Sequence, residues 1–138
     1  MEKNDEKVQN EEMSGEELPK IVVIVQARMG SVRLPGKVLL PILGRPMLQF
    51  QLERLRLVQQ ADQLIVATTS LEEDRPIVAL CKQMGVDVFC GESEDVLKRY
   101  YDCARLCGAG IVVRITGDCP LIDPEIVDKV IGFYMGLS

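Results

Sequence analysis

The 138-residue sequence contains no histidine and no tryptophan, and it has only three phenylalanines and three tyrosines. Without histidine, a Ser-His-Asp triad and a histidine general base are both excluded. Any catalysis must therefore rest on carboxylates, lysine, arginine, hydroxyl groups or a metal ion. The scarcity of aromatic side chains also gives little support for nucleic-acid binding.

Long apolar runs are missing as well. No stretch approaches the ~20 apolar residues that span a bilayer, and the polar N-terminus lacks the apolar core of a signal peptide. We therefore expect no membrane partner and a cytoplasmic protein. Hydrophobic residues make up 47% of the chain and charged residues 27%, which is typical of soluble globular proteins. The length suits one domain.

The net charge of −5 belongs to the first 19 residues, which hold seven acidic side chains against two lysines. Residues 20–138 are neutral, without the basic excess that phosphate neutralisation by a nucleic-acid binder requires. Residues 1–19 hold almost nothing apolar, and we predict a disordered acidic tail. It could be a solvating leader or a docking segment. Residues 20–138 form the predicted folded domain.

Five cysteines are scattered through the chain without a C-x-x-C pair. Together with the lack of histidine, this odd number favours neither a zinc site nor a disulfide framework. Cys103 and Cys107 lie four residues apart on an expected helix, and we interpret them as small core residues.

Four short apolar runs alternate with amphipathic stretches. We expect strands at residues 21–26, 64–68, 86–90 and 111–115, and helices at residues 46–60, 74–84, 94–106 and 123–134. Ser93 and Asp123 are the expected N-caps of the last two helices. Residues 27–44 are expected to be a loop. This order predicts an α/β fold with a mostly parallel sheet, helices on both faces and right-handed crossovers.

Three polar loops follow expected strands, at residues 26–37, 91–95 and 116–120. Ligands of open parallel sheets bind at the carboxyl ends of strands. The first loop combines glycines, a serine, two arginines and a lysine, which suits a polyphosphate. It is no P-loop, because five residues separate Gly30 from Gly36 and Val38 stands where a hydroxyl is required. From this loop alone, phosphate binding and a surface turn with solvated cations both remain open.

Five motifs occur in a definite order: Q-A-R-M-G-S-V-R-L-P-G-K-V-L at 26–39, L-G-R-P-M-L at 43–48, V-A-T at 66–68, G-E-S-E-D-V-L at 91–97 and R-I-T-G-D-C-P-L-I-D at 114–123. Together they resemble the cytidylyltransferases over residues 21–136. The resemblance is closest to the spore coat polysaccharide biosynthesis type, which is related to the acylneuraminate and 3-deoxy-manno-octulosonate enzymes.

The resemblance implies a nucleotide-diphospho-sugar transferase fold, which is Rossmann-like, and it makes residues 20–138 the nucleotide-binding α/β domain. It also implies transfer of CMP from CTP to a sugar acid or related sugar, with release of pyrophosphate, in surface polysaccharide biosynthesis. The implied phosphate-binding and catalytic residues are Arg28 and Lys37, the implied substrate contacts are Gln26, Ala27, Gly30, Ser31, Gly91, Ser93 and Thr116, and the implied ligand of Mg²⁺ is Asp118.

Alternative interpretations exist at several positions. Asp118 could instead cap its loop, and Asp95 could serve the helix or the pocket. Arg114 could contact phosphate or sugar, or form an interior salt bridge. Related sugar-acid enzymes often have glutamine where this chain has Thr116.

Family members continue well beyond the position that corresponds to Ser138, so the resemblance implies a C-terminally truncated fold. Missing strands would expose apolar faces, and we expect a homo-oligomer, which light scattering would test. A second hypothesis is a non-catalytic module that binds nucleotide or a protein partner.

Overall fold

The computed structural model describes residues 18–30, 35–117 and 120–136. All but the last two residues of the predicted acidic tail lie outside these ranges, as do Ser31 and Asp118. None of the helices in the described part of the chain is long and apolar enough to cross a lipid bilayer.

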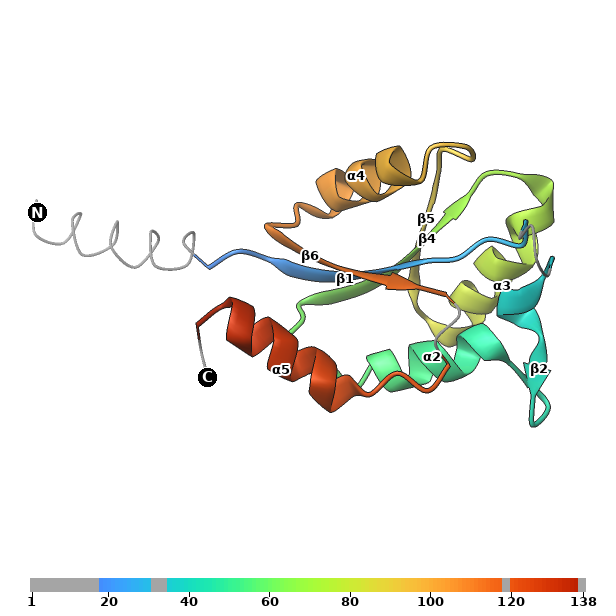
Figure 1. The fold of residues 1–138 in the computed structure, drawn as a ribbon. Helices are drawn as coiled ribbons and strands as arrows, with labels where there is room; N and C mark the ends of the chain where they lie inside the picture. The colour runs from blue at the N-terminus through green and yellow to red at the C-terminus, as the bar shows by residue number, and fades with distance from the viewer. Residues whose placement is uncertain (1–17, 31–34, 118–119, 137–138) are drawn as a thin grey trace, which may run out of the picture.

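A four-stranded parallel sheet forms the centre of the fold, as predicted (Figure 1). The predicted strands are confirmed to within one residue at each end. The sheet has the order β5-β4-β1-β6, in which β1 spans Ile21–Gln26, β4 Gln63–Thr69, β5 Asp87–Gly91 and β6 Ile111–Thr116. Strand β1 therefore lies between β4 and β6, and it is buried on both sides.

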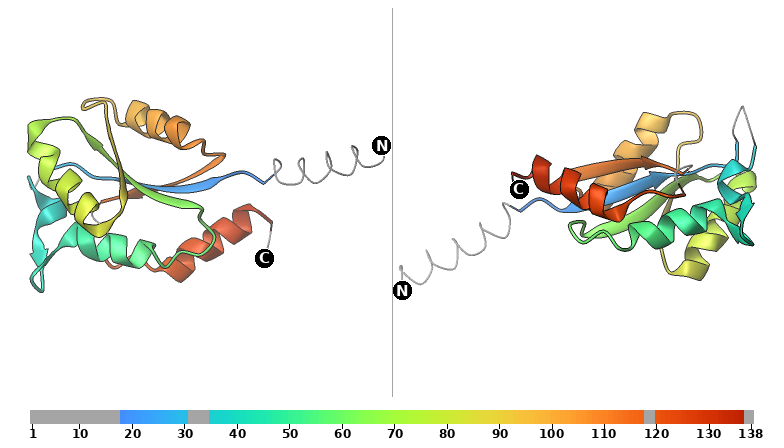
Figure 2. Two further views of the ribbon diagram at one scale, coloured as in Figure 1. Left: turned by 180° about the vertical axis from the view of Figure 1, so that it is seen from behind. Right: turned by 60° about the horizontal axis from the view of Figure 1, so that its bottom comes forward.

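Helices cover both faces of the sheet, which confirms the predicted layers (Figures 1 and 2). Helix α4 (Val96–Cys107) lies alone on one face, while α2 (Met47–Leu55), α3 (Arg75–Met84) and α5 (Pro124–Tyr134) lie on the other. Alternate residues of β1 enter the two cores: Val23 and Val25 pack toward the three-helix face, and Val22 and Ile24 toward α4. The unbroken β-branched run of β1 is thus explained by burial on both faces.

The segment predicted as one loop at residues 27–44 contains regular structure, so that prediction was wrong. A short 3₁₀ helix, η1 (Lys37–Leu39), is followed by an antiparallel hairpin of β2 (Pro41–Ile42) and β3 (Arg45–Pro46). The hairpin turns at Leu43 and Gly44, whose φ angles are 51° and 81°. Positive φ at both central positions is the geometry that matches the twist of a two-residue hairpin.

Helix α2 ends at Leu55, five residues before the predicted end. The backbone N–H groups of Gln59 and Gln60 donate to the carboxylate of Asp128 on α5, at 3.0 and 2.8 Å, instead of continuing a helix. A tertiary contact of this kind has no signal in the local sequence.

The predicted N-cap of α4 was also wrong. Asp95 caps this helix, because its Oδ1 accepts the backbone N–H of Lys98 at 3.0 Å, and Ser93 lies upstream in the preceding loop. Of the two alternatives for Asp95, the structure shows the helix role. Asp123 is confirmed as the N-cap of α5, where it accepts the N–H of Glu125 at 2.9 Å.

Among the described residues, the contact recorded for the Arg114 guanidinium is with an aromatic ring, and both alternatives given for Arg114 stay predictions. Its guanidinium lies 4.4 Å from the centre of the Tyr100 ring, a cation–π contact. Cys103 is buried and Cys107 half-buried, both as free thiols, which confirms the core interpretation. Burial, with a smaller effect of Cys107, raises the pKa of Cys103 to about 12.

Candidate functional site

The strand order places a topological switch point between β1 and β6. The chain adds β4 and then β5 on one side of β1, and it returns to add β6 on the other side. The chain leaves β1 toward β4, away from β6, so the carboxyl ends of β1 and β6 border the crevice of a switch point. A cavity of about 260 Å³ lies there, lined by Gln26, Ala27, Arg28, Gly30, Lys37, Val38, Thr116 and Gly117.

Six of the residues singled out from the sequence line this one cavity: Gln26, Ala27, Arg28, Gly30, Lys37 and Thr116. They come from the ends of β1 and β6 and from the start of η1. Arg28 and Lys37 give the cavity two cationic side chains, and no acidic residue is among the described residues that line it. The cavity is therefore suited to an anion.

The loop after β1 is fixed to the sheet by a buried carboxylate. Asp74, fully buried at the end of η2 (Glu72–Asp74), accepts the backbone N–H of Met29 at 2.7 Å and the hydroxyl of Thr69. The N–H of Gly36 donates to the Met29 carbonyl at 2.7 Å and closes the loop. Arg28 and Gly30 are thus held on a backbone anchored on both sides of them.

The guanidinium of Arg28 is oriented by a segment from the far side of the sheet. Its Nη1 donates to the Ser93 carbonyl at 2.8 Å. Its Nε is buried and has no hydrogen-bond partner within the described residues. A side chain at Gly30 would put its Cβ 2.9 Å from Nη2 of Arg28, so glycine leaves room for this guanidinium. Arg28 therefore keeps donors available for a ligand.

The loop after β6 approaches β1 closely at Gly117. Its N–H donates to the Gln26 carbonyl at 2.8 Å, and a Cβ there would lie 2.9 Å from the same oxygen. From α2, the fully buried Gln51 donates Nε2 to the Thr116 carbonyl at 2.6 Å. Glycine is therefore required at position 117 for the loop to lie this close to β1. Gln51 fixes the backbone of Thr116, the residue before it.

Two predicted contacts lie beside the cavity and not in its lining. Gly91 ends β5, and Ser93 offers Arg28 its carbonyl. A Cβ at Gly91 would lie 2.5 Å from the Phe89 ring, so glycine also has a packing role there. The predicted metal ligand Asp118 and the predicted contact Ser31 are outside the described residues, among which no cluster of three metal-ligating side chains occurs.

Sequence reasoning missed Asp74, Arg99, Gln51 and Gly117. A polar residue within the apolar stripe of α2 was a signal for Gln51, and a glycine at a strand end was a signal for Gly117. Asp74 was interpreted only as part of a helix start. Nothing in the spacing of Arg99 distinguishes it from the exposed cations around it.

A larger hollow of about 460 Å³ lies elsewhere, between the outer side of α3 and the ends of β4 and β5. Its cations are Lys82 and the largely exposed Arg75, which pairs with Glu72 at 3.1 Å. It lies away from the switch point, and no glycine-rich backbone lines it. The smaller cavity is therefore the better candidate site.

Comparison with known proteins identifies the family of the chain. The family model described as cytidylyltransferase matches residues 22–134. The spore coat polysaccharide biosynthesis protein SpsF of Bacillus subtilis is 39% identical over 115 residues, which cover 80% of this chain and 48% of SpsF.

Solved structures of cytidylyltransferases are similar to this chain as well. A cytidylyltransferase from Leptospira borgpetersenii superposes with a TM-score of 0.83 at 40% identity, over 86% of this chain and 50% of that one. A CMP:2-keto-3-deoxy-manno-octonic acid synthetase complexed with CTP superposes with a TM-score of 0.73 at 30% identity, over 85% and 48% of the two chains. The chain thus spans about half the length of the relatives that it matches.

Proposed function

The chain belongs to the cytidylyltransferase family, and from this premise we propose that it binds CTP in the cavity between β1 and β6. We propose further that the whole protein transfers CMP from CTP to a sugar acid or related sugar. Pyrophosphate is the second product, and the reaction serves surface polysaccharide biosynthesis. The spore coat relative and the octulosonate synthetase with bound CTP support this substrate class.

The observation that carries the proposal is the pair of cations, Arg28 and Lys37, on one cavity at the switch point. In the proposed reaction a sugar hydroxyl oxygen bonds to the α-phosphorus, and the bond from that phosphorus to the pyrophosphate oxygen breaks. Negative charge grows on the phosphate oxygens and on the leaving pyrophosphate, so fixed cations lower the barrier. The planar fork of Arg28 suits several phosphate oxygens, and Lys37 suits a single one.

With the triphosphate at Arg28 and Lys37, the other predicted substrate contacts can be assigned to parts of the nucleotide. Gly30 and Ser31 would offer backbone and hydroxyl donors beside it. Gln26, Ala27 and Thr116, at the ends of adjacent strands, would lie under the nucleoside. Gly91 and Ser93 would border the base and ribose.

A magnesium ion is part of the proposal. No carboxylate belongs to the described lining of the cavity, so Asp118, which follows Gly117 directly, would be its protein ligand. One carboxylate with phosphate oxygens and water is a common magnesium environment, so the residues fit the ion. Bound there, it would neutralise charge on the phosphates. We also propose a cytoplasmic protein, and a homo-oligomer in which exposed apolar side chains of α5 such as Phe133 are covered.

Release of pyrophosphate from CTP, measured against a panel of sugar acids, tests the proposed reaction. We expect turnover with at least one acid, and a loss of about a hundredfold in kcat/KM for Arg28→Ala and for Lys37→Ala. Arg45→Ala is the matched control, because Arg45 is a partly exposed cation that pairs with Glu53 away from the cavity. Binding of CTP without turnover of any acid would instead favour a non-catalytic nucleotide-binding module.

A further inference from the structure

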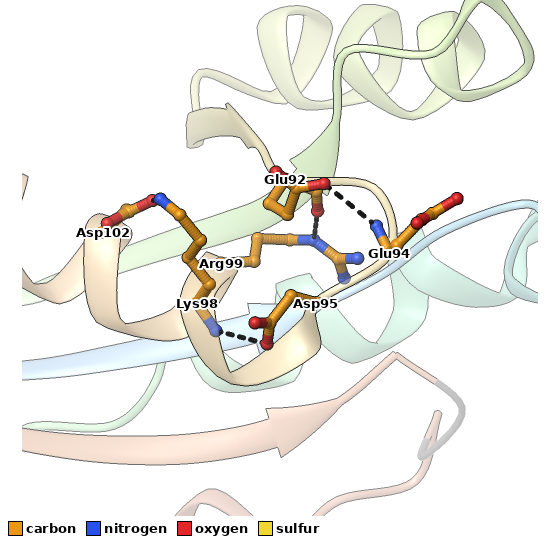
Figure 3. Close-up of polar contacts among 6 residues, drawn as sticks. All are labelled: Glu92, Glu94, Asp95, Lys98, Arg99 and Asp102. Carbon is orange, nitrogen blue, oxygen red and sulfur yellow. Dashed lines mark hydrogen bonds and ion pairs between the residues drawn. The ribbon is translucent and has the colours of Figure 1, made fainter.

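Arg99 is a fully buried cation on α4, and it is not among the residues that line the cavity. Its side chain points back toward the loop that precedes the helix, as Figure 3 shows. Nε donates to the Glu92 carbonyl at 2.7 Å, and Nη2 donates to the Ser93 carbonyl at 3.1 Å. Arg99 therefore clamps two consecutive carbonyls of the loop between β5 and α4.

The Ser93 carbonyl receives two guanidinium groups. Arg28 reaches it at 2.8 Å from the loop after β1, and Arg99 reaches it from α4. Nη1 of Arg99 and Nε of Arg28 are both buried without a hydrogen-bond partner in the ranges that the structure describes. Two guanidinium groups thus donate to one neutral carbonyl oxygen, and each guanidinium also has a buried N–H without an acceptor.

No carboxylate within the described residues forms a salt bridge with either arginine. The strongest anionic influence on Arg99 comes from Asp74, but the oxygens of Asp74 already accept the Met29 N–H and the Thr69 hydroxyl. Burial lowers the pKa of Arg99, and the charge of Arg28 lowers it further. Arginine nevertheless stays charged in proteins. An uncompensated buried charge is costly, and a bound anion would compensate it.

We propose that Arg99 is a positioning residue for the triphosphate of CTP: it fixes the Ser93 carbonyl that orients Arg28, and its charge adds to the attraction of the phosphates. The inference rests on the proposed binding of CTP. If Arg99 served only to hold the Glu92 and Ser93 carbonyls, neutral hydrogen-bond donors would be enough. A second positive charge beside Arg28 would then bring only repulsion. The juxtaposition of Arg28 and Arg99 therefore points to an anion.

Lys98 provides a matched control one residue away. It carries the same charge on the same helix, but it is exposed and pairs with Asp102 at 2.8 Å (Figure 3). Its removal changes the net charge of the molecule as much as the removal of Arg99 does. A difference in nucleotide affinity between the Arg99 and Lys98 variants therefore comes from the position of the charge and not from the change in net charge.

Calorimetric titration of CTP and of CMP into the full chain, with magnesium, tests the inference in Arg99→Met, Arg99→Lys and Lys98→Met. We expect Arg99→Met to weaken CTP binding about tenfold and CMP binding much less, because CMP lacks the β- and γ-phosphates. Arg99→Lys, which keeps the charge but loses the fork, should lose less. Lys98→Met should bind both nucleotides as the parent does.

A double-mutant cycle with Arg28→Met completes the test. Since Arg99 acts partly through Arg28, its replacement should weaken CTP binding clearly less once Arg28 is gone. Equal losses for CTP and CMP, or full additivity of the two substitutions, would overturn the inference. If Arg99→Met does not fold, a parent-like CTP affinity in a folded Arg99→Lys would overturn it too. No CTP binding by the parent chain would refute the proposed function instead.

Discussion

Asp74 shows at the scale of a single residue how the candidate site is held. It is fully buried and makes its hydrogen bonds to the loop after β1 and to the end of β4. Because it joins the backbone beside Arg28 to the sheet, its loss should loosen the cavity as well as the core. Its sequence neighbours are charged and exposed, so its burial had no signal in the sequence.

Replacement of Asp74 by alanine should therefore destabilise the fold by about 2 kcal/mol or more, since the partly buried Met29 N–H and the buried Thr69 hydroxyl lose their acceptor. Urea denaturation measures the change in the free energy of unfolding. Asp87→Ala is the control, because Asp87 is an exposed carboxylate that accepts Gln63 Nε2 at 3.0 Å; it should change stability by less than about 0.5 kcal/mol. Equal effects of the two substitutions would show that Asp74 is not the anchor.

Residue types and their order were enough to predict the two cations that line the cavity. Arg28 and Lys37 stand in a loop directly after a buried strand, and the rule for parallel sheets places such loops at the ligand site. Arg99 was missed because its role depends on the Ser93 carbonyl. The sharing of that carbonyl with Arg28 is a tertiary contact that spacing along the chain does not encode.

At the scale of elements, the predicted strands agree with the structure because each is a short, mostly apolar run bounded by polar or glycine residues. The errors lie where another part of the chain decides the conformation. Helix α2 ends early where Asp128 of α5 takes the backbone N–H groups. The hairpin of β2 and β3 was missed because two prolines in two-residue strands give no strand pattern.

The turn of that hairpin gives a prediction of its own. Leu43 adopts φ of 51° and is 91% exposed, so it has the strain of a left-handed leucine without the gain from burial. Leu43→Asn creates an Asn-Gly turn, which should stabilise the fold by about 0.5 to 1 kcal/mol in thermal or urea unfolding.

Leu57→Asn is the comparison for this prediction, because Leu57 is also exposed and its φ is not positive. It should give no stabilisation. A loss of stability in Leu43→Asn would mean that Leu43 makes apolar contacts with a partner surface.

At the scale of the whole molecule, the order β5-β4-β1-β6 brings together the loops that the sequence had only marked as polar. The alternation of strands and helices predicted a parallel sheet, but not which strands are neighbours. Several apolar side chains of α5 are exposed, among them Ile126, Val130 and Phe133. Self-association through such a surface stays a prediction.

The central claim is that the cavity between β1 and β6 binds CTP. Calorimetric titration of the full chain with CTP, ATP and GTP in the presence of magnesium tests it most directly. We predict one site per chain, at least about tenfold tighter for CTP than for either purine nucleotide. Equal affinities for the three nucleotides, or no measurable heat with CTP, would contradict the claim.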